Sequence, residues 1–228
     1  VFHMCFRIRV VDKSLNIDDY IQTYKSSYWI DNNHSILCFN QPVRNQYYCV
    51  FSLPYMFDRF THVSNELVDY RSNVNILLHS KQNRTKVITL NDTVPYTLEL
   101  FQIFQKSFPR AQELMFIIAP IRCLSDNLLN NELIMENIVS VIFLVEELKY
   151  KHFRRLLLMT PNILKLYILQ SLVLDVLRKS QDSSFEQLQS ICNRIRLVCI
   201  DRRSFERDAL NDKRIKRLFP NAERSGWR

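Results

Sequence analysis

Histidine and carboxylate side chains are the groups in this chain whose types could bind a metal or transfer a proton. The five histidines are His3, His34, His62, His79 and His152. None has a partner at the short spacings of metal-binding or catalytic motifs. Asp18 and Asp19 are the tightest carboxylate pair, but adjacent helical residues point about 100° apart, which favours capping and solvation over a catalytic dyad. We therefore expect no metal and no catalytic residue.

The cysteines and the scarcity of glycine also argue against an enzyme. The six cysteines form no Cys-x-x-Cys pair, and most lie in apolar stretches such as "ILCF" and "LVCI", which favours buried, reduced thiols over disulfides or zinc. They are Cys5, Cys38, Cys49, Cys123, Cys192 and Cys199. Gly226 is the only glycine, so the phosphate-cradling loop, the dinucleotide-binding turn and the nucleophile elbow are all excluded. No cofactor is expected.

The net charge of +8 raises the question of a nucleic-acid partner. Nine Lys/Arg and five Asp/Glu lie between Asp201 and Arg228, and "KRIKR" (Lys213 to Arg217) could contact phosphates or direct nuclear import. An Asp212–Lys216 pair would instead make this a solvated helix face. Aromatic residues do not alternate with the basic ones, as they would on a surface that binds single strands. We therefore do not expect nucleic acid as the partner.

No targeting or membrane-spanning segment is visible in the sequence. The longest apolar stretch, Leu156 to Leu177, is interrupted by charged and amide side chains. Without a secretory signal, we expect an intracellular location, cytoplasmic or nuclear. The chain begins at Val1 inside an alternating pattern, so we expect it to be a fragment of a longer protein.

Five short runs rich in β-branched and aromatic residues predict strands. They are "KVITL", "LMFII", "SVIFLV", "LKLYI" and "IRLVCI". Their first inward-facing residues are expected to be Ile88, Leu114, Val141, Leu166 and Ile195, at spacings of 26, 27, 25 and 29 residues. Each of these residues begins an apolar–x–apolar triplet, so the strands recur with a regular period.

Helix-like segments lie between these strands, at Thr97 to Phe108, Glu147 to Met159 and Ser184 to Ile191. Pro109 and Pro161 follow two of these helices and start the turn into the next strand. A strand–turn–helix unit of this length is typical of an irregular leucine-rich-repeat horseshoe, an α/β fold with parallel strands on the concave face and helices on the convex face. The competing fold is a doubly wound α/β domain, which the nearly continuous apolar strands favour and the short period disfavours.

The period fails in the N-terminal third of the chain. The alternation from Phe2 to Val11 predicts a strand, Ser14 to Tyr24 a helix capped by Ser14, and "SILCFN" with "YYCVFS" a β-hairpin. Pro54 is expected to open a helix that continues to Leu67. We therefore predict residues 1–84 as one repeat strand at Met4 to Val10 plus an insertion with the hairpin, and residues 85–228 as the repeat array. A separate small N-terminal domain is the alternative.

Three segments carry a resemblance to a known family. They are "SLPYMFDRFTHVSNEL" (Ser52 to Leu67), "NDTVPYTLELFQIFQKSFPRAQELMFI" (Asn91 to Ile117) and "TPNILKLYIL" (Thr160 to Leu169). They resemble the body of F-box/leucine-rich-repeat-like proteins, in which an N-terminal F-box precedes irregular repeats. The resemblance implies the substrate-recognition subunit of a cullin-RING ubiquitin ligase, whose F-box docks on a Skp1-type adaptor while the repeats hold a target.

The chain departs from that family at the F-box. Leu53-Pro54 matches the opening of the motif, but Met56 stands where an acidic residue is expected. The segment Ser72 to Arg84 is polar and strand-like, where compact helices should follow. An F-box, and with it a Skp1-type adaptor as partner, is therefore expected only if the parent protein has one upstream of Val1.

The residues between the two inward positions of each strand should line the concave face and bind a protein target. They are Thr89, Met115, Ile142, Tyr167 and Arg196, with Lys165 beside Tyr167. An apolar patch left bare is unusual unless something binds it, and tyrosine and arginine often anchor interfaces. The opposing possibility is that the insertion Ser14 to Asn83, or a part of the parent protein upstream of Val1, folds over this face.

The sequence therefore predicts a macromolecule-binding repeat scaffold without enzyme activity, and a membrane partner is not expected. Two other functions stay open at this point. The first is a basic solenoid that binds nucleic acid, and the second is a small α/β enzyme of unknown chemistry.

Overall fold

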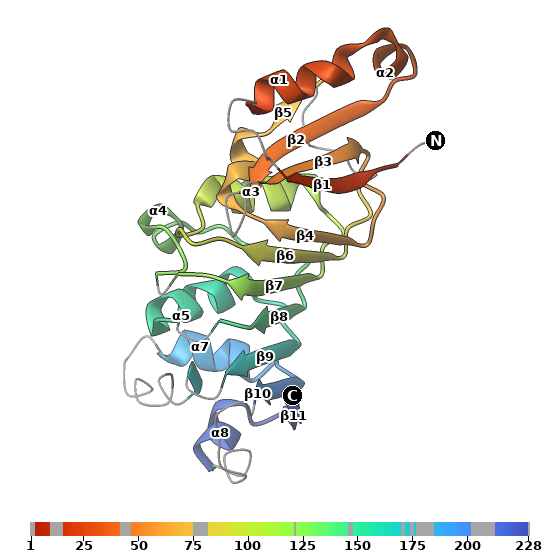
Figure 1. Cartoon of the computed structure of the whole chain (residues 1–228). Helices are drawn as coiled ribbons and strands as arrows, with labels where there is room; N and C mark the ends of the chain where they lie inside the picture. Colours follow the sequence, from red (N-terminus) through yellow and green to blue (C-terminus); the bar gives the residue numbers. More distant parts are fainter. Residues whose placement is uncertain are drawn as a thin grey trace.

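In the computed structural model shown in Figure 1, a seven-stranded parallel sheet extends from β4 (Arg59–Val63) to the C-terminal end of the molecule. The structure describes residues 3–9, 16–41, 47–74, 82–120, 122–145, 148–169, 172–173, 176, 185–201 and 213–227. The strands are β4 (Arg59–Val63), β6 (Val87–Asn91), β7 (Glu113–Ile118), β8 (Ser140–Phe143), β9 (Lys165–Leu169), β10 (Leu197–Asp201) and β11 (Glu223–Trp227). Neighbours in the sheet follow one another along the chain, and all are parallel. The predicted parallel, sequence-ordered arrangement of strands is confirmed.

The predicted inward positions of the first four strand runs are confirmed. Their eight residues are at most 1% exposed and pair side by side in register, so alternate side chains point into one core. They are Ile88, Leu90, Leu114, Phe116, Val141, Phe143, Leu166 and Ile168. Each apolar–x–apolar triplet therefore marks one strand.

The prediction for β10 is wrong by three residues. Val198, not Ile195, pairs with Leu166, and the inward residues of this strand are Val198 and Ile200. Ile195 is buried in the turn before the strand, where its amide donates to the Cys192 carbonyl. Because the run Leu197 to Ile200 is apolar at every position, alternation alone gives no phase for this strand.

Helices lie on one side of the parallel sheet, behind the strands in Figure 1. They are α3 (Leu98–Ser107), α4 (Asp126–Leu129), α5 (Tyr150–Met159), α7 (Phe185–Cys192) and α8 (Lys213–Leu218). Thr97 caps α3 by accepting a hydrogen bond from the Leu100 amide at 3.3 Å. The apolar stripes of α3, α5 and α7 share a single core with the inward strand residues. On α8 the exposed Lys213, Lys216 and Arg217 form a solvated face, while Asp212 lies outside the described residues.

Two buried polar side chains on α5 hold the segment around α4. Arg155, 8% exposed, donates from Nε to the Leu128 carbonyl and from Nη2 to the Leu133 carbonyl, each at 3.0 Å. His152, 1% exposed, accepts at Nδ1 from the Leu124 amide at 3.2 Å. These bonds satisfy main-chain groups that would otherwise be buried without partners.

Side-chain amides tie the turns that precede successive strands to one another. In each case an asparagine Nδ2 donates to a main-chain carbonyl in the preceding turn, at 2.8–2.9 Å. The pairs are Asn137 with Pro109, Asn162 with Glu136, and Asn221 with Asn193. These short bonds fix the spacing of the turns along the edge where the strands begin.

The N-terminal third forms a second, antiparallel sheet. Its strands lie in the order β1 (Cys5–Arg9), β3 (Tyr47–Leu53), β2 (Ser35–Gln41) and β5 (Arg71–Ser72). The predicted hairpin is confirmed as β2–β3. The predicted repeat strand at Met4 to Val10 is wrong, because β1 pairs antiparallel with β3 and takes no part in the parallel sheet. Alternation reveals a strand but not its partner, and this partner lies about forty residues away.

The helix predicted from Pro54 to Leu67 is also wrong. The segment instead supplies β4 and a 3₁₀ helix, η2 (Asn65–Asp69). Phe60 and Val63 of β4 pair with Ile88 and Leu90 of β6, so β4, not β1, is the first strand of the parallel sheet. The apolar spacing in this segment is compatible with a helix, but the hydrogen bonds between β4 and β6 stabilise a strand there.

The helical part of the N-terminal third covers the outer face of the antiparallel sheet. It consists of α1 (Ile17–Gln22), η1 (Thr23–Lys25) and α2 (Ser27–Asp31), and Asn16 rather than Ser14 caps α1 by accepting from the Asp19 amide at 2.8 Å. Ser14 itself lies outside the described residues, as does His79. Ile21 and Tyr24 pack with Ile36 and Val50 in a small second core.

The antiparallel sheet closes the β4 end of the main core. On β2 and β3, Leu37, Phe39, Cys49 and Phe51 point away from α1 and join the main core next to Phe60. The alternate residues of the same strands face α1. In Figure 1 this sheet and α1 accordingly lie beyond β4, at the end of the parallel sheet.

Candidate binding face of the parallel sheet

Four of the predicted site residues form one row across the face of the parallel sheet that is opposite the helices. Thr89 pairs with Met115, Met115 with Ile142, and Ile142 with Tyr167, on the successive strands β6 to β9. Adjacent strands lie about 4.8 Å apart, so the four side chains are direct neighbours. Sequence reasoning placed these residues correctly because each sits between two buried, inward-facing neighbours.

Arg196 does not belong to this row, which corrects its predicted place. Its amide donates to the Leu164 carbonyl at 2.9 Å, which sets it in the turn before β10. The row continues instead through Cys199 and Ser225. Sequence reasoning missed Cys199 because of the wrong phase of β10, and Ser225 because it predicted no strand at β11. Lys165 faces the same side as Tyr167 at the first position of β9, exposed and paired with Leu197.

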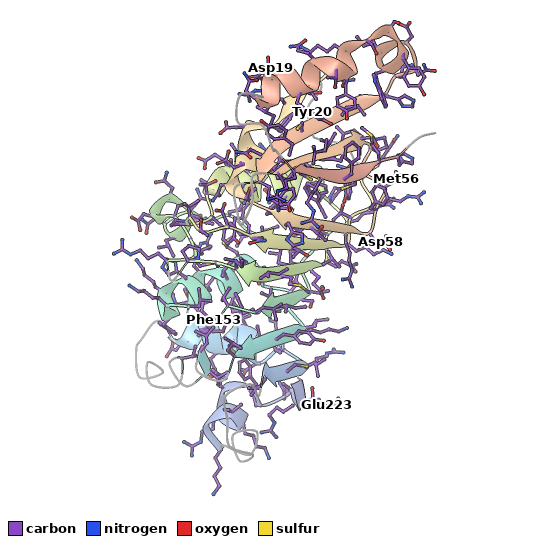
Figure 2. The ribbon with its side chains drawn as sticks, viewed as in Figure 1. Asp19, Tyr20, Met56, Asp58, Phe153 and Glu223 are labelled. Carbon is purple, nitrogen blue, oxygen red and sulfur yellow. The ribbon has the colours of Figure 1, made fainter. Side chains whose placement is uncertain are left out.

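The row residues shield one another from solvent. Thr89, Ile142 and Cys199 are 5%, 8% and 5% exposed, and Met115 and Tyr167 are half-buried. No described helix or strand lies over this face in Figure 1. In Figure 2, which shows the side chains in the same view, Phe153 of α5 lies on the helix side of the sheet. The described residues between Ser14 and Asn83 sit at the end of the sheet, so the expectation that they cover the face is wrong for them.

The β9–β11 end of the row is uncharged. Cys199 Sγ lies 3.1 Å from Ser225 Oγ, and burial, followed by the neighbouring Cys199 thiol, raises the pKa of Tyr167. The phenol therefore stays neutral at physiological pH. On the adjacent strands Ser140 Oγ donates to Glu113 Oε2 at 2.9 Å. These hydroxyl, thiol and phenol groups offer contacts and hydrogen bonds, and the Glu113 carboxylate holds the Ser140 hydroxyl in place.

The β4 end of the face carries a polar cluster that sequence reasoning missed. His62 has a positive φ of 58° where the pairing of β4 with β6 becomes irregular. Its Nδ1 lies 3.1 Å from Asn91 Nδ2, and its carbonyl accepts from Gln41 Nε2. Burial, and then the charge of Arg7, lower the pKa of His62, so the imidazole is neutral and Nδ1 accepts from Asn91. No motif links these residues, which come together only through the junction of the two sheets.

The cluster resembles a structural joint more than a reaction centre. The partners of His62 are two amides, and neither can act as a nucleophile or as a general base. Within the described residues no group of three or more His, Cys, Asp or Glu side chains could hold a metal ion. The same part of the chain contains no helix with the length and apolar character needed to cross a bilayer.

Comparison of the chain with protein-family models, with curated proteins and with solved structures finds no match. The resemblance to F-box/leucine-rich-repeat-like proteins thus stays a prediction. Function has to be argued from the geometry of the sheet face.

Proposed function

We propose that the chain is a protein-binding scaffold with the architecture of an irregular leucine-rich-repeat horseshoe, and that its partner lies on the free face of the parallel sheet. The observation that carries this proposal is the register row Thr89, Met115, Ile142 and Tyr167 on four successive strands. Sequential parallel strands with helices on one side support the repeat architecture, because a doubly wound sheet has helices on both faces.

The chemistry of the row suits a protein partner. The half-buried Met115 supplies apolar contact, next to the buried Ile142, and the flexible thioether of a methionine adapts to irregular surfaces. Tyr167 adds a half-buried ring with a neutral phenol, a side chain that often dominates interface energetics. The exposed Lys165 and the Glu113 carboxylate border this strip and provide a polar rim.

The resemblance supports a more specific role, in which the scaffold is the substrate-recognition part of an F-box-type ubiquitin ligase adaptor. In that role the sheet face holds the target protein. A Skp1-type adaptor would be engaged by an F-box upstream of Val1, which is outside this chain. Fold-level analogy is the only support for this role, so it needs a test of its own.

A site-specific photo-crosslinker tests the binding face. p-Azidophenylalanine at Tyr167 replaces the phenol hydroxyl by a small azide and reports what touches the row, and the same group at the exposed Lys151 of α5 reports the helix side. We expect a discrete crosslinked protein in cells from position 167 and none from position 151. The proposal would be refuted if position 151 gave the same crosslinked product. It would also be refuted if the product from position 167 persisted after Met115→Lys is added at the row. Co-purification of the full natural protein with a Skp1-type adaptor tests the ligase role separately.

A further inference from the structure

A basic hollow of about 740 Å³ lies along the edge where β8 to β11 begin. It is lined by side chains from four successive turns, with three amides, two guanidinium groups and an apolar floor. The lining includes Asn162, Asn193, Asn221, Arg194, Arg196 and Leu164. Arg196, misplaced on the sheet face by sequence reasoning, belongs to this hollow.

The walls of the hollow are held in place by hydrogen bonds. Asn162 and Asn221 are fixed by their bonds to the preceding turns, and Asn193 Oδ1 accepts from Gln189 Nε2 at 2.8 Å. Arg194 makes only a long contact, 3.5 Å from Nη1 to the Pro161 carbonyl. The hollow is therefore largely preformed, which lowers the entropic cost of binding a ligand.

The guanidinium groups of Arg194 and Arg196 can bind a ligand, because their positive charges are not neutralised by a described carboxylate. Among the described residues, the Arg196 side chain has no hydrogen-bond or ion-pair partner, and neither arginine lies within ion-pair distance of a carboxylate. No aspartate or glutamate of the described part of the chain lines the hollow. Lys165 adds a third positive charge close by, because it pairs with Leu197, the residue after Arg196. Arginine forks bind carboxylates through paired hydrogen bonds, so the hollow is suited to anionic groups.

The floor of the hollow favours a ligand that is apolar as well as anionic. Leu164 is 37% exposed, one of the few large apolar side chains left open to solvent, and Val139 lies beside it. A peptide that alternates acidic and leucine-like side chains can place carboxylates on the arginines and an apolar group on Leu164. A solvated anion alone would leave that surface bare.

We propose that the hollow binds an acidic, leucine-containing segment of the partner protein. This inference rests on the proposed function and names the chemistry of the segment recognised. A polynucleotide fits less well, because the described residues of the lining include no aromatic side chain on which a base could stack.

Fluorescence anisotropy tests the proposal without the natural partner. The probes are a labelled twelve-residue peptide of repeating Asp-Glu-Leu, its Asn-Gln-Leu analogue, and a twelve-nucleotide oligouridine. The variant Arg194→Gln/Arg196→Gln is compared with Arg110→Gln/Lys151→Gln, which removes two exposed positive charges elsewhere. We expect the acidic peptide to bind, the first variant to weaken it about tenfold or more, and the control to weaken it less than about twofold.

Three results would overturn the inference. They are the absence of peptide binding, equal weakening by both variants, and tighter binding of oligouridine that depends on the same two arginines. Circular dichroism confirms that each variant is folded. Crosslinking from position 167 does not involve the hollow, so it can still succeed if the acidic segment is wrong. Conversely, peptide binding at the hollow can persist if the sheet face proves to be empty.

Discussion

Truncation of Leu166 to alanine is the sharpest test of how the strands are phased. Leu166 is fully buried in the middle of the parallel sheet, between Val141 of β8 and Val198 of β10. The same phase places Tyr167 on the opposite face. A measurement on Leu166 therefore also tests the placement of the proposed binding row.

The magnitude follows from burial and from the rigidity of the surroundings. Full burial of a leucine side chain is worth about 1.5–3 kcal/mol, and the cavity left by truncation adds to that loss. Since Leu166 has a paired strand on each side, its neighbours have little freedom to collapse into the cavity. We expect the free energy of unfolding to fall by about 3–5 kcal/mol, the upper part of the range for leucine truncations.

Urea unfolding followed by circular dichroism measures this loss, and Leu164→Ala is the matched control. Leu164 lies two residues earlier, is 37% exposed, and undergoes the same chemical change. Its truncation should cost less than about 1 kcal/mol. In thermal melts, the Leu166 variant should unfold at least about 6 °C below the parent, from about 2 °C per kcal/mol for a chain of this size.

The reasoning fails if the two variants exchange behaviour. A Leu166→Ala protein that unfolds like the parent, beside a Leu164→Ala protein that is strongly destabilised, would place Leu166 on the solvent side of β9. The row Thr89, Met115, Ile142 and Tyr167 would then point into the core, and the proposed binding face would have to be abandoned.

Two further predictions concern buried polar groups on α5. Arg155→Met should lower the free energy of unfolding by about 2–4 kcal/mol, because the carbonyls of Leu128 and Leu133 lose their donors, whereas the half-buried Arg154→Met should cost less than about 1 kcal/mol in the same urea experiment. Equal losses would contradict the buried role of Arg155. Burial, and then the charges of two nearby lysines, lower the pKa of His152 to about 4. Between pH 6.5 and 4 the unfolded chain therefore binds a proton at this histidine more readily than the folded chain does, so the free energy of unfolding falls as the pH drops through this window. The loss between pH 7.5 and 4.5 should be about 2–3 kcal/mol smaller in His152→Asn, which keeps an acceptor, and an unchanged pH dependence would show that His152 does not titrate this way.

Sequence patterns predicted the correct inward-facing residues for the four strands β6 to β9. In the run around Ile88, alternation between apolar and other residues marks which side chains point inward, and burial agrees. The run around Leu114 is apolar throughout, and its phase follows instead from Pro109 five residues earlier and from the 26-residue spacing to Ile88. The run from Leu197 to Ile200 in β10 is also apolar at every position. Its phase is set by pairing with the parallel strands β9 and β11, which no local pattern reveals. The misplacement of Arg196 follows from this ambiguity.

The N-terminal third shows a second limit of local patterns. The apolar spacing of Phe57, Phe60, Val63 and Leu67 fits a helix, yet β4 is selected by its pairing with β6, in which Phe60 lies beside Ile88, 28 residues further along the chain. The same junction creates the polar cluster of His62 and Asn91, 29 residues apart in the chain. A site that arises from the meeting of two sheets has no sequence signature for a local pattern to detect.

The corrected phase of β10 separates two surfaces that the sequence had merged, and their spacing indicates how one partner could use both. Arg196 is level with Leu164, three residues before Tyr167 along the strand direction. At about 3.3 Å per strand residue, the basic hollow lies about 10 Å from the binding row. Lys165 stands between them on the face and prolongs the positive charge toward Tyr167. An extended segment covers about 3.3–3.6 Å per residue, so three or four residues suffice to place an acidic side chain on the arginines and an apolar one beside Tyr167. Two weak contacts joined by so short a segment act almost as a single site, since the second contact forms at high effective concentration.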